Sequence, residues 1–151
     1  MDEKPTILLI DDSESDRFLM RLAFKKAGFD CALPEVCDGA EAIAYLKGDG
    51  AHGDRDTFPL PHVMFLDLNM PVKNGFEVLE WLRGQPSLKR ITVLILTASM
   101  READAARAFD LGVNWFLIKP SEMDSLVALI RTLRDWMRFT QFPTLNEAAK
   151  K

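Results

Sequence analysis

The sequence has few of the features that mark secreted, membrane or nucleic-acid-binding proteins. Its two cysteines, Cys31 and Cys37, lack the CxxC spacing and the neighbouring histidine of a zinc site, so we interpret them as plain thiols. No apolar run approaches the length of a membrane span, and acidic residues precede the first apolar run, which is the reverse of a secretory signal. The net charge of -4 argues against nucleic acid, which requires a basic face. We expect a cytoplasmic protein without membrane or nucleic-acid partners.

Five apolar runs alternate with five amphipathic stretches along the 151 residues, a length that allows one domain with a sizeable core. The expected strands are residues 6–10, 31–37, 62–67, 91–97 and 114–118. The expected helices are residues 13–27, 39–47, 75–83, 99–111 and 121–138. This alternation predicts an α/β fold, a single doubly wound domain with a parallel sheet, right-handed crossovers and helices on both faces.

Three stretches depart from the alternation. Pro34 interrupts the second strand and favours a place at the edge of the sheet. Residues 48–61 are dominated by Gly, Asp and Pro and form either a mobile insertion or a binding loop. His52 in this loop could be a ligand, but we interpret it as a solvated histidine. The tail at 139–151 has little pattern. We therefore expect a domain over 1–138 and no output domain after it.

Polar residues stand where four of the expected strands end. They are Asp11 and Asp12 after the first, Asp67 after the third, Thr97 in the fourth and Lys119 after the fifth. The ends of parallel strands meet at one edge of a sheet, so these side chains can converge. Three close carboxylates repel unless a divalent cation lies among them, and oxygen ligands with water suit Mg²⁺. A lysine and a hydroxyl opposite the metal would hold the oxygens of a phosphoryl group.

Each of these residues also has an ordinary interpretation. Asp11 and Asp12 could cap the first helix, Thr97 could be a plain strand residue, and Lys119 could belong to a solvated turn. Chance seldom places all of them at the matching ends of successive strands, and this joint placement favours a functional site.

The segments LLIDDS, MFLDLNMPVKNG, LILTAS and FLIKP together resemble the receiver domain of two-component response regulators. The resemblance covers residues 5 to about 138. It implies a flavodoxin-like fold, with a five-stranded parallel sheet in the order 2-1-3-4-5. The chain is also similar to single-domain regulators that partner bacterial phytochromes, in its long loop, its segment HVMFLDLNMP and its tail. This similarity implies that its partner is a sensor histidine kinase of the phytochrome kind.

The resemblance also implies roles for the residues at the strand ends. Asp67 would accept a phosphoryl group from a histidine kinase. Thr97 and Lys119 would contact the phosphoryl oxygens. The Mg²⁺ ligands would be Asp12, Asp67 and the backbone carbonyl of Asn69, with Asp11 supporting the metal through water.

A switch and an interaction surface follow from the same resemblance. On phosphorylation Thr97 would move toward the phosphoryl group and Phe116 would turn inward, although Phe116 could equally be plain core. The fourth helix, fifth strand and fifth helix would form a homodimer surface. Side chains expected on this surface are Trp115, Trp136, Arg107, Arg131 and Arg134.

Two other classes of function remain open from the sequence. One is a phosphohydrolase of the haloacid-dehalogenase type, whose nucleophile motif DxD would need an Asp where this chain has Ser13. The other is a binding module that works without phosphorylation. The leading interpretation is a stand-alone phosphoacceptor that passes a signal by protein contact or by onward transfer of the phosphoryl group, for which "enzyme" is a poor description.

Overall fold

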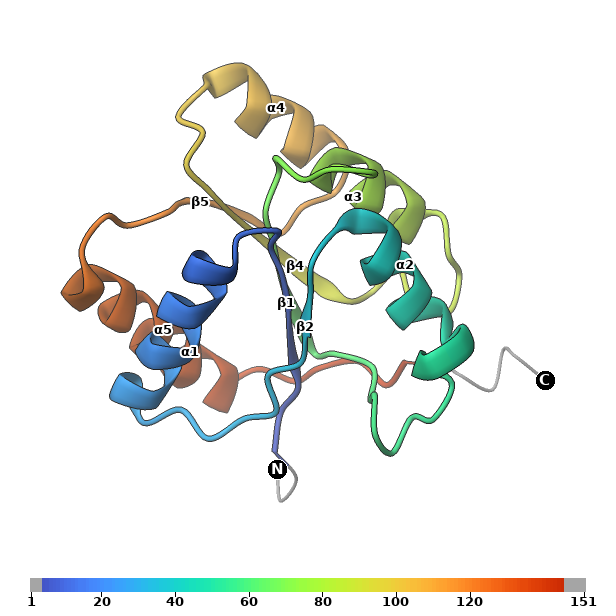
Figure 1. The fold of residues 1–151 in the computed structure, drawn as a ribbon, viewed down its shortest axis with the longest axis horizontal. Coiled ribbons are helices and arrows are strands. Elements are labelled where there is room, and N and C mark those ends of the chain that lie inside the picture. Colours follow the sequence, from blue (N-terminus) through green and yellow to red (C-terminus); the bar gives the residue numbers. More distant parts are fainter. Residues whose placement is uncertain (1–3, 146–151) are drawn as a thin grey trace.

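Five strands form one parallel sheet in the order β2-β1-β3-β4-β5 in a computed structural model, which describes residues 4–145 (Figure 1). The strands are β1 (Ile7–Ile10), β2 (Glu35–Val36), β3 (Val63–Leu66), β4 (Thr92–Thr97) and β5 (Trp115–Ile118). The helices are α1 (Glu14–Ala27), α2 (Gly39–Lys47), α3 (Gly75–Arg83), α4 (Glu102–Asp110) and α5 (Met123–Arg138), with a 3-10 helix η1 (Gly50–His52). The α/β fold and the strand order expected from the sequence are confirmed.

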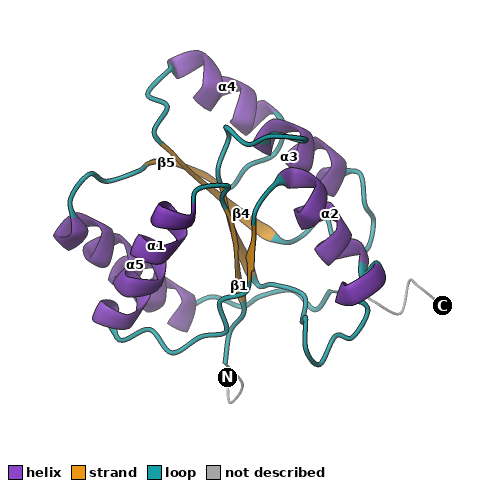
Figure 2. Cartoon of the chain, in the orientation of Figure 1, coloured by secondary structure: helices purple, strands orange, loops and turns teal. Residues whose placement is uncertain are grey.

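The helices cover the sheet in two groups, with α1 and α5 on one face and α2, α3 and α4 on the other (Figure 2). Successive side chains of a strand point to opposite faces. In β1, Ile7 and Leu9 therefore pack with α1 and α5, whereas Leu8 and Ile10 pack with α2 and α3. Both faces are buried at β1, β3 and β4, which explains why these strands are continuous apolar runs in the sequence, whereas β5 is partly exposed.

The second strand is much shorter than the expected 31–37. Its ladder with β1 is limited to Glu35–Val36, and an isolated bridge joins Thr6 to Ala32. Pro34 has no N–H to donate and so interrupts the ladder, although its carbonyl accepts a hydrogen bond from the N–H of Leu9 at 2.9 Å. The predicted place of this strand at the edge of the sheet is confirmed.

Two helices begin later than expected. Helix α4 starts at Glu102 instead of Ser99, because the Ser99 hydroxyl and N–H bond to side chains on either side and hold this residue in the loop. Helix α5 starts at Met123 instead of residue 121 and has 16 residues.

Among residues 4–145, none of the helices has the length and apolar character that a membrane span requires.

The segment 48–61 is an ordered connection. Arg55 donates hydrogen bonds to the carbonyl oxygens of Tyr45 and Leu46, each at 2.8 Å, and to that of Phe58 at 3.2 Å. The half-buried ring of His52 lies between Tyr45 and Phe58, with centroid distances of 5.2 and 5.0 Å. The expectation of a solvated histidine at this position is therefore wrong, since the ring closes a small aromatic cluster.

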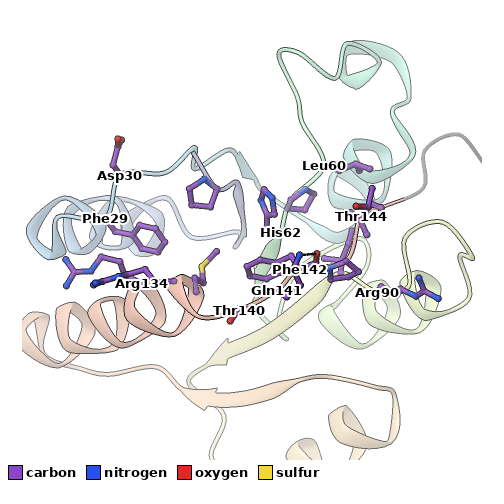
Figure 3. A pocket seen from close by; sticks show the side chains of 17 residues that line it. Phe29, Asp30, Leu60, His62, Arg90, Arg134, Thr140, Gln141, Phe142 and Thr144 are labelled. Carbon is purple, nitrogen blue, oxygen red and sulfur yellow. Dashed lines mark hydrogen bonds between the residues drawn. The ribbon is translucent and has the colours of Figure 1, made fainter. Parts of the chain in front are cut away.

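The first part of the tail crosses beneath the sheet from α5 toward α2 (Figure 1). Phe142 contacts the rings of His62 and Trp136, while Leu145 packs against the core on the α2 and α3 side. A cavity of about 1010 Å³ lies beside this segment, with Arg90 and Arg134 among its lining residues (Figure 3). The tail thus lies at the amino ends of β1, β3 and β4, on the side of the sheet opposite the carboxyl ends of the strands.

Candidate functional site

The carboxyl ends of β1 and β3 bring three aspartates together. The two strands pair in parallel with Ile10 opposite Leu66, so the residues that follow, Asp11 and Asp67, lie next to each other. The N–H of Asp67 donates to the carbonyl oxygen of Ile10 at 3.0 Å and fixes this alignment. One carboxylate oxygen from each of Asp11, Asp12 and Asp67 lies within 4.8 Å of the other two. The structure therefore gathers the carboxylates that the sequence placed at two separate strand ends.

The three carboxylates differ in burial, and this difference sets their electrostatics. Asp11 is 3% exposed, Asp67 is half-buried and Asp12 is exposed. Burial raises the pKa of Asp67 to about 6; Lys119 opposes this rise, Asp11 adds to it, and the backbone N–H of Asn69 opposes it. The site thus concentrates negative charge in a partly desolvated place, where a bound cation would reduce the repulsion between the carboxylates.

Lys119 lies beside the aspartates but is shared with a fourth carboxylate. Its ammonium nitrogen is 2.9 Å from Oδ2 of Asp11 and 2.9 Å from Oδ2 of Asp16 in α1. Burial would lower the pKa of Lys119, but the hydrogen bonds to Asp16 and Asp11 outweigh it and raise that pKa. The N–H of Lys119 donates to the carbonyl oxygen of Thr97 at 2.7 Å, so the end of β4 fixes the lysine backbone.

Thr97 is the last residue of β4 and is fully buried. Its hydroxyl oxygen accepts a hydrogen bond from the N–H of Ser99 at 3.2 Å. The Ser99 hydroxyl in turn lies 2.6 Å from Oδ2 of Asp104 in α4. A chain of polar contacts therefore links the end of β4 to the first turn of α4.

The loop from β3 to α3 turns sharply directly after Asp67. Gly75 lies so close to the carbonyl oxygen of Asp67 that a Cβ atom there would overlap with it. Val72 has a φ of 67°, an uncommon conformation for a β-branched residue. Asn74 and Glu77 form a capping box, each accepting from the other's backbone N–H at 3.0 Å. The turn and the capped first turn of α3 together hold the backbone of Asp67 in place.

The predicted switch residue Phe116 is half-buried in β5 and packs against the core under α2, α3 and α4. Its neighbour Trp115 is 62% exposed. Arg131 and Arg134, which the sequence predicted on the same surface, instead donate to the carbonyl oxygens of the last two residues of α1, at 3.4 and 2.8 Å, so the prediction is wrong for these two arginines. On α4, the Arg107 guanidinium lies 4.1 Å from the ring centroid of Phe76 in α3. This cation–π contact holds α4 against α3 in the present arrangement.

The family model of the response regulator receiver domain matches residues 7–131, which include all of these strand ends. The chain belongs to the response regulator receiver family. The receiver domain is 34% identical over 138 residues to the response regulator Rcp1 of Synechocystis sp. (strain ATCC 27184 / PCC 6803 / Kazusa), and the match covers 91% of this chain and 92% of Rcp1.

Solved structures of two phytochrome or red-light regulators are similar to this receiver domain. The phosphorylated cyanobacterial phytochrome response regulator RcpA is 31% identical, with a TM-score of 0.85 over 94% of this chain and 100% of RcpA. The response regulator RPA3017, in red light signalling of R. palustris, is 31% identical, with a TM-score of 0.87 over 93% of this chain and 99% of RPA3017.

The donor set of this receiver domain fits a divalent metal ion. It offers three hard carboxylate oxygens close together. The three residues range from buried to exposed, so water can reach a bound ion from the exposed side. Asp12 is the exposed member and Asp11 the buried one. A crystal structure of the Mn²⁺-bound form of Rcp1 has a TM-score of 0.81 with this chain at 33% identity, over 93% of this chain and 99% of Rcp1.

One residue of the site was missed in the sequence. Asp16 does not stand at a strand end, and its only local signal is Ser13, whose side chain accepts from the N–H of Asp16 at 3.2 Å as the N-cap of α1. That capping bond also shows that Ser13, and not Asp11 or Asp12, caps α1. Asp11 nevertheless has a local contact as well, because its Oδ1 accepts a hydrogen bond from the N–H of Ser13 at 2.9 Å.

Proposed function

We propose that Asp67 accepts a phosphoryl group from the phosphohistidine of a sensor histidine kinase, in a reaction that depends on Mg²⁺. The observation that supports this role is the half-buried Asp67 carboxylate, which lies against Asp11 and Asp12 and within the field of Lys119. An Asp67 oxygen would form the new P–O bond as the P–N bond breaks, and the imidazole would leave with a proton. Phosphoryl transfer of this kind requires positioning and charge neutralisation more than further covalent chemistry.

The remaining site residues would neutralise charge. Mg²⁺ would be held by Asp12, Asp67 and the carbonyl of Asn69, with Asp11 supporting it, and would offset the charge on the carboxylate and phosphoryl oxygens. Lys119 and the hydroxyl of Thr97 would contact phosphoryl oxygens. Because the product is the modified protein itself, we propose that the domain acts as a signalling phosphoacceptor and not as a turnover enzyme.

The surface next to the site suits a protein partner such as the kinase. On α1, Phe18 is 54% exposed and Leu19 is 42% exposed. Leu19 shares a shallow depression with Lys119 and Pro120, beside Asp16. An exposed apolar side chain beside Lys119 is expected where a macromolecular donor docks. The similarity to Rcp1, RcpA and RPA3017 supports a bacterial phytochrome as that kinase.

The output would be a change at the α4, β5 and α5 face. Thr97 would move toward the phosphoryl group and Phe116 would turn inward, by packing alone because Phe has no hydroxyl. The face carries the exposed apolar side chains Phe109, Trp115 and Trp136, which suit a homodimer. We further propose that phosphorylation shifts this dimer equilibrium.

The test of the proposed function is intact mass after incubation with acetyl phosphate, with and without Mg²⁺. The expected result is one added phosphoryl group in the wild type with Mg²⁺, and none without Mg²⁺ or in Asp67→Asn. Rapid donor hydrolysis without an adduct would instead indicate a phosphohydrolase, and no reaction at all would indicate a binding module. Light scattering of the phosphorylated sample, with Phe116→Ala for comparison, tests the dimer; an unchanged response in that variant would remove Phe116 from the switch.

A further inference from the structure

The ammonium group of Lys119 bridges two carboxylates of very different surroundings. The Asp11 side chain is 4% exposed and that of Asp16 is 39% exposed, and each places an oxygen 2.9 Å from the same nitrogen. Asp11 belongs to the cluster of three aspartates, whereas Asp16 comes from the first turn of α1. The lysine is therefore held from two sides, once by the cluster of three aspartates and once by Asp16 of α1.

These two carboxylates would respond differently to a phosphoryl group on Asp67. A dianionic phosphoryl group attracts Lys119 more strongly than the present carboxylate does. Asp11 is buried and would be costly to leave without a cation. Asp16 faces water, so its carboxylate can be hydrated when the ammonium leaves. The bond that yields is accordingly the one to Asp16.

We propose that Asp16 is a positioning residue that competes with the phosphoryl group for Lys119. In the unphosphorylated domain Asp16 holds the ammonium by a hydrogen-bonded ion pair, and phosphorylation of Asp67 draws it away. Asp16 thereby weakens the hold of the site on phosphoryl oxygens and favours the unphosphorylated state. This inference rests on the proposed function, because it assumes that Asp67 carries the phosphoryl group.

The position of Asp16 is fixed independently of Lys119. Its N–H donates to the side chain of the N-cap Ser13, and an acidic residue in the first helical turn suits the helix dipole. A purely structural role in α1 is thus the alternative that the test must separate. Asp124 offers a matched control, because it is also an exposed acid in the first turn of a helix, α5.

The test measures the dissociation constant of beryllofluoride, a phosphoryl analogue, by ¹⁹F NMR titration in Mg²⁺. Asp16→Asn is expected to bind roughly two- to five-fold tighter than wild type, as the loss of a partly exposed ion pair predicts, and Asp124→Asn to match wild type. In a Lys119→Ala background, Asp16→Asn should have no effect, since Asp16 acts through that lysine.

Each other outcome overturns the inference. Unchanged or weaker binding by Asp16→Asn would show that Asp16 does not compete. Tighter binding that persists in the Lys119→Ala background would show a general charge effect instead. If the wild-type protein binds no beryllofluoride, both the proposed function and this inference are rejected. If the wild type binds it and Asp16→Asn binds it equally well, only the inference is rejected. Thermal midpoints of all variants exclude unfolding as the cause.

Discussion

The sheet uses charged residues in opposite ways where its strands begin, here called the amino edge, and where they end, here called the carboxyl edge. At the amino edge, Arg83 donates to the carbonyl oxygens of Lys89, Ile91 and Gly112 at 2.6, 2.8 and 2.9 Å, so one cation satisfies several loop carbonyls. At the carboxyl edge, three carboxylates gather within 4.8 Å and share a lysine with a fourth. At the amino edge a positive charge fixes loops. At the carboxyl edge the excess of negative charge lowers the stability of the fold and prepares the site to bind a cation.

The largest effect on the fold is expected at the amino edge. Arg83→Ala removes the donor of three loop carbonyls and one of the two donors to Oδ1 of Asn114, and should lower the free energy of unfolding by about 2–3 kcal/mol. Urea denaturation measures this loss. The exposed Arg90 is the control, and Arg90→Ala should change stability by less than about 0.5 kcal/mol. Equal losses in both variants would contradict the comparison.

The carboxyl edge should show the opposite sign. The pKa of Asp67 is raised from 3.8 to about 6, so the folded protein holds this proton more tightly than the unfolded chain does. Its contribution to stability is complete below about pH 4 and is lost as the pH rises through about 6. At pH 7 without metal, Asp67→Asn should therefore be more stable than wild type by roughly 1–2 kcal/mol, a figure reduced for partial exposure.

Urea denaturation from pH 4 to 8, with and without Mg²⁺, checks the sign at Asp67. The difference between wild type and Asp67→Asn should vanish near pH 4 and shrink when Mg²⁺ is added at pH 7. A variant less stable than wild type at pH 7 would mean that the carboxylate stabilises the fold, and the contrast between the edges would fail.

The smallest effect concerns the two thiols that flank β2. Cys31 lies on the amino side and is half-buried, and burial raises its pKa to about 11, whereas Cys37 lies on the carboxyl side and is exposed. At pH 8 iodoacetamide should modify Cys37 at least about ten-fold faster than Cys31, because the thiolate is the nucleophile. Peptide mapping over time measures both rates. Equal rates would show that the amino edge is open to solvent.

Local patterns in the sequence predicted the sheet and the aspartates because these depend on single segments. The apolar runs end where the strands end, so the sequence alone indicates that Asp11 and Asp67 stand at the ends of two strands. The second partner of Lys119 could not be predicted in this way, since Asp16 does not stand at a strand end and meets the lysine only through packing of α1 beside the sheet. The rings around His52 and the shortening of β2 at Pro34 also depend on tertiary contacts.

The short tail segment after α5 has a consequence for cooperativity. Side chains on the two faces of the sheet form separate cores, and they share only backbone where they meet in a strand. The tail reaches both, with Phe142 in the α1 and α5 core and Leu145 against the core of α2 and α3. Residues 139–145 therefore connect the two cores, which could otherwise unfold one at a time. This connection favours unfolding of the domain as a single cooperative unit.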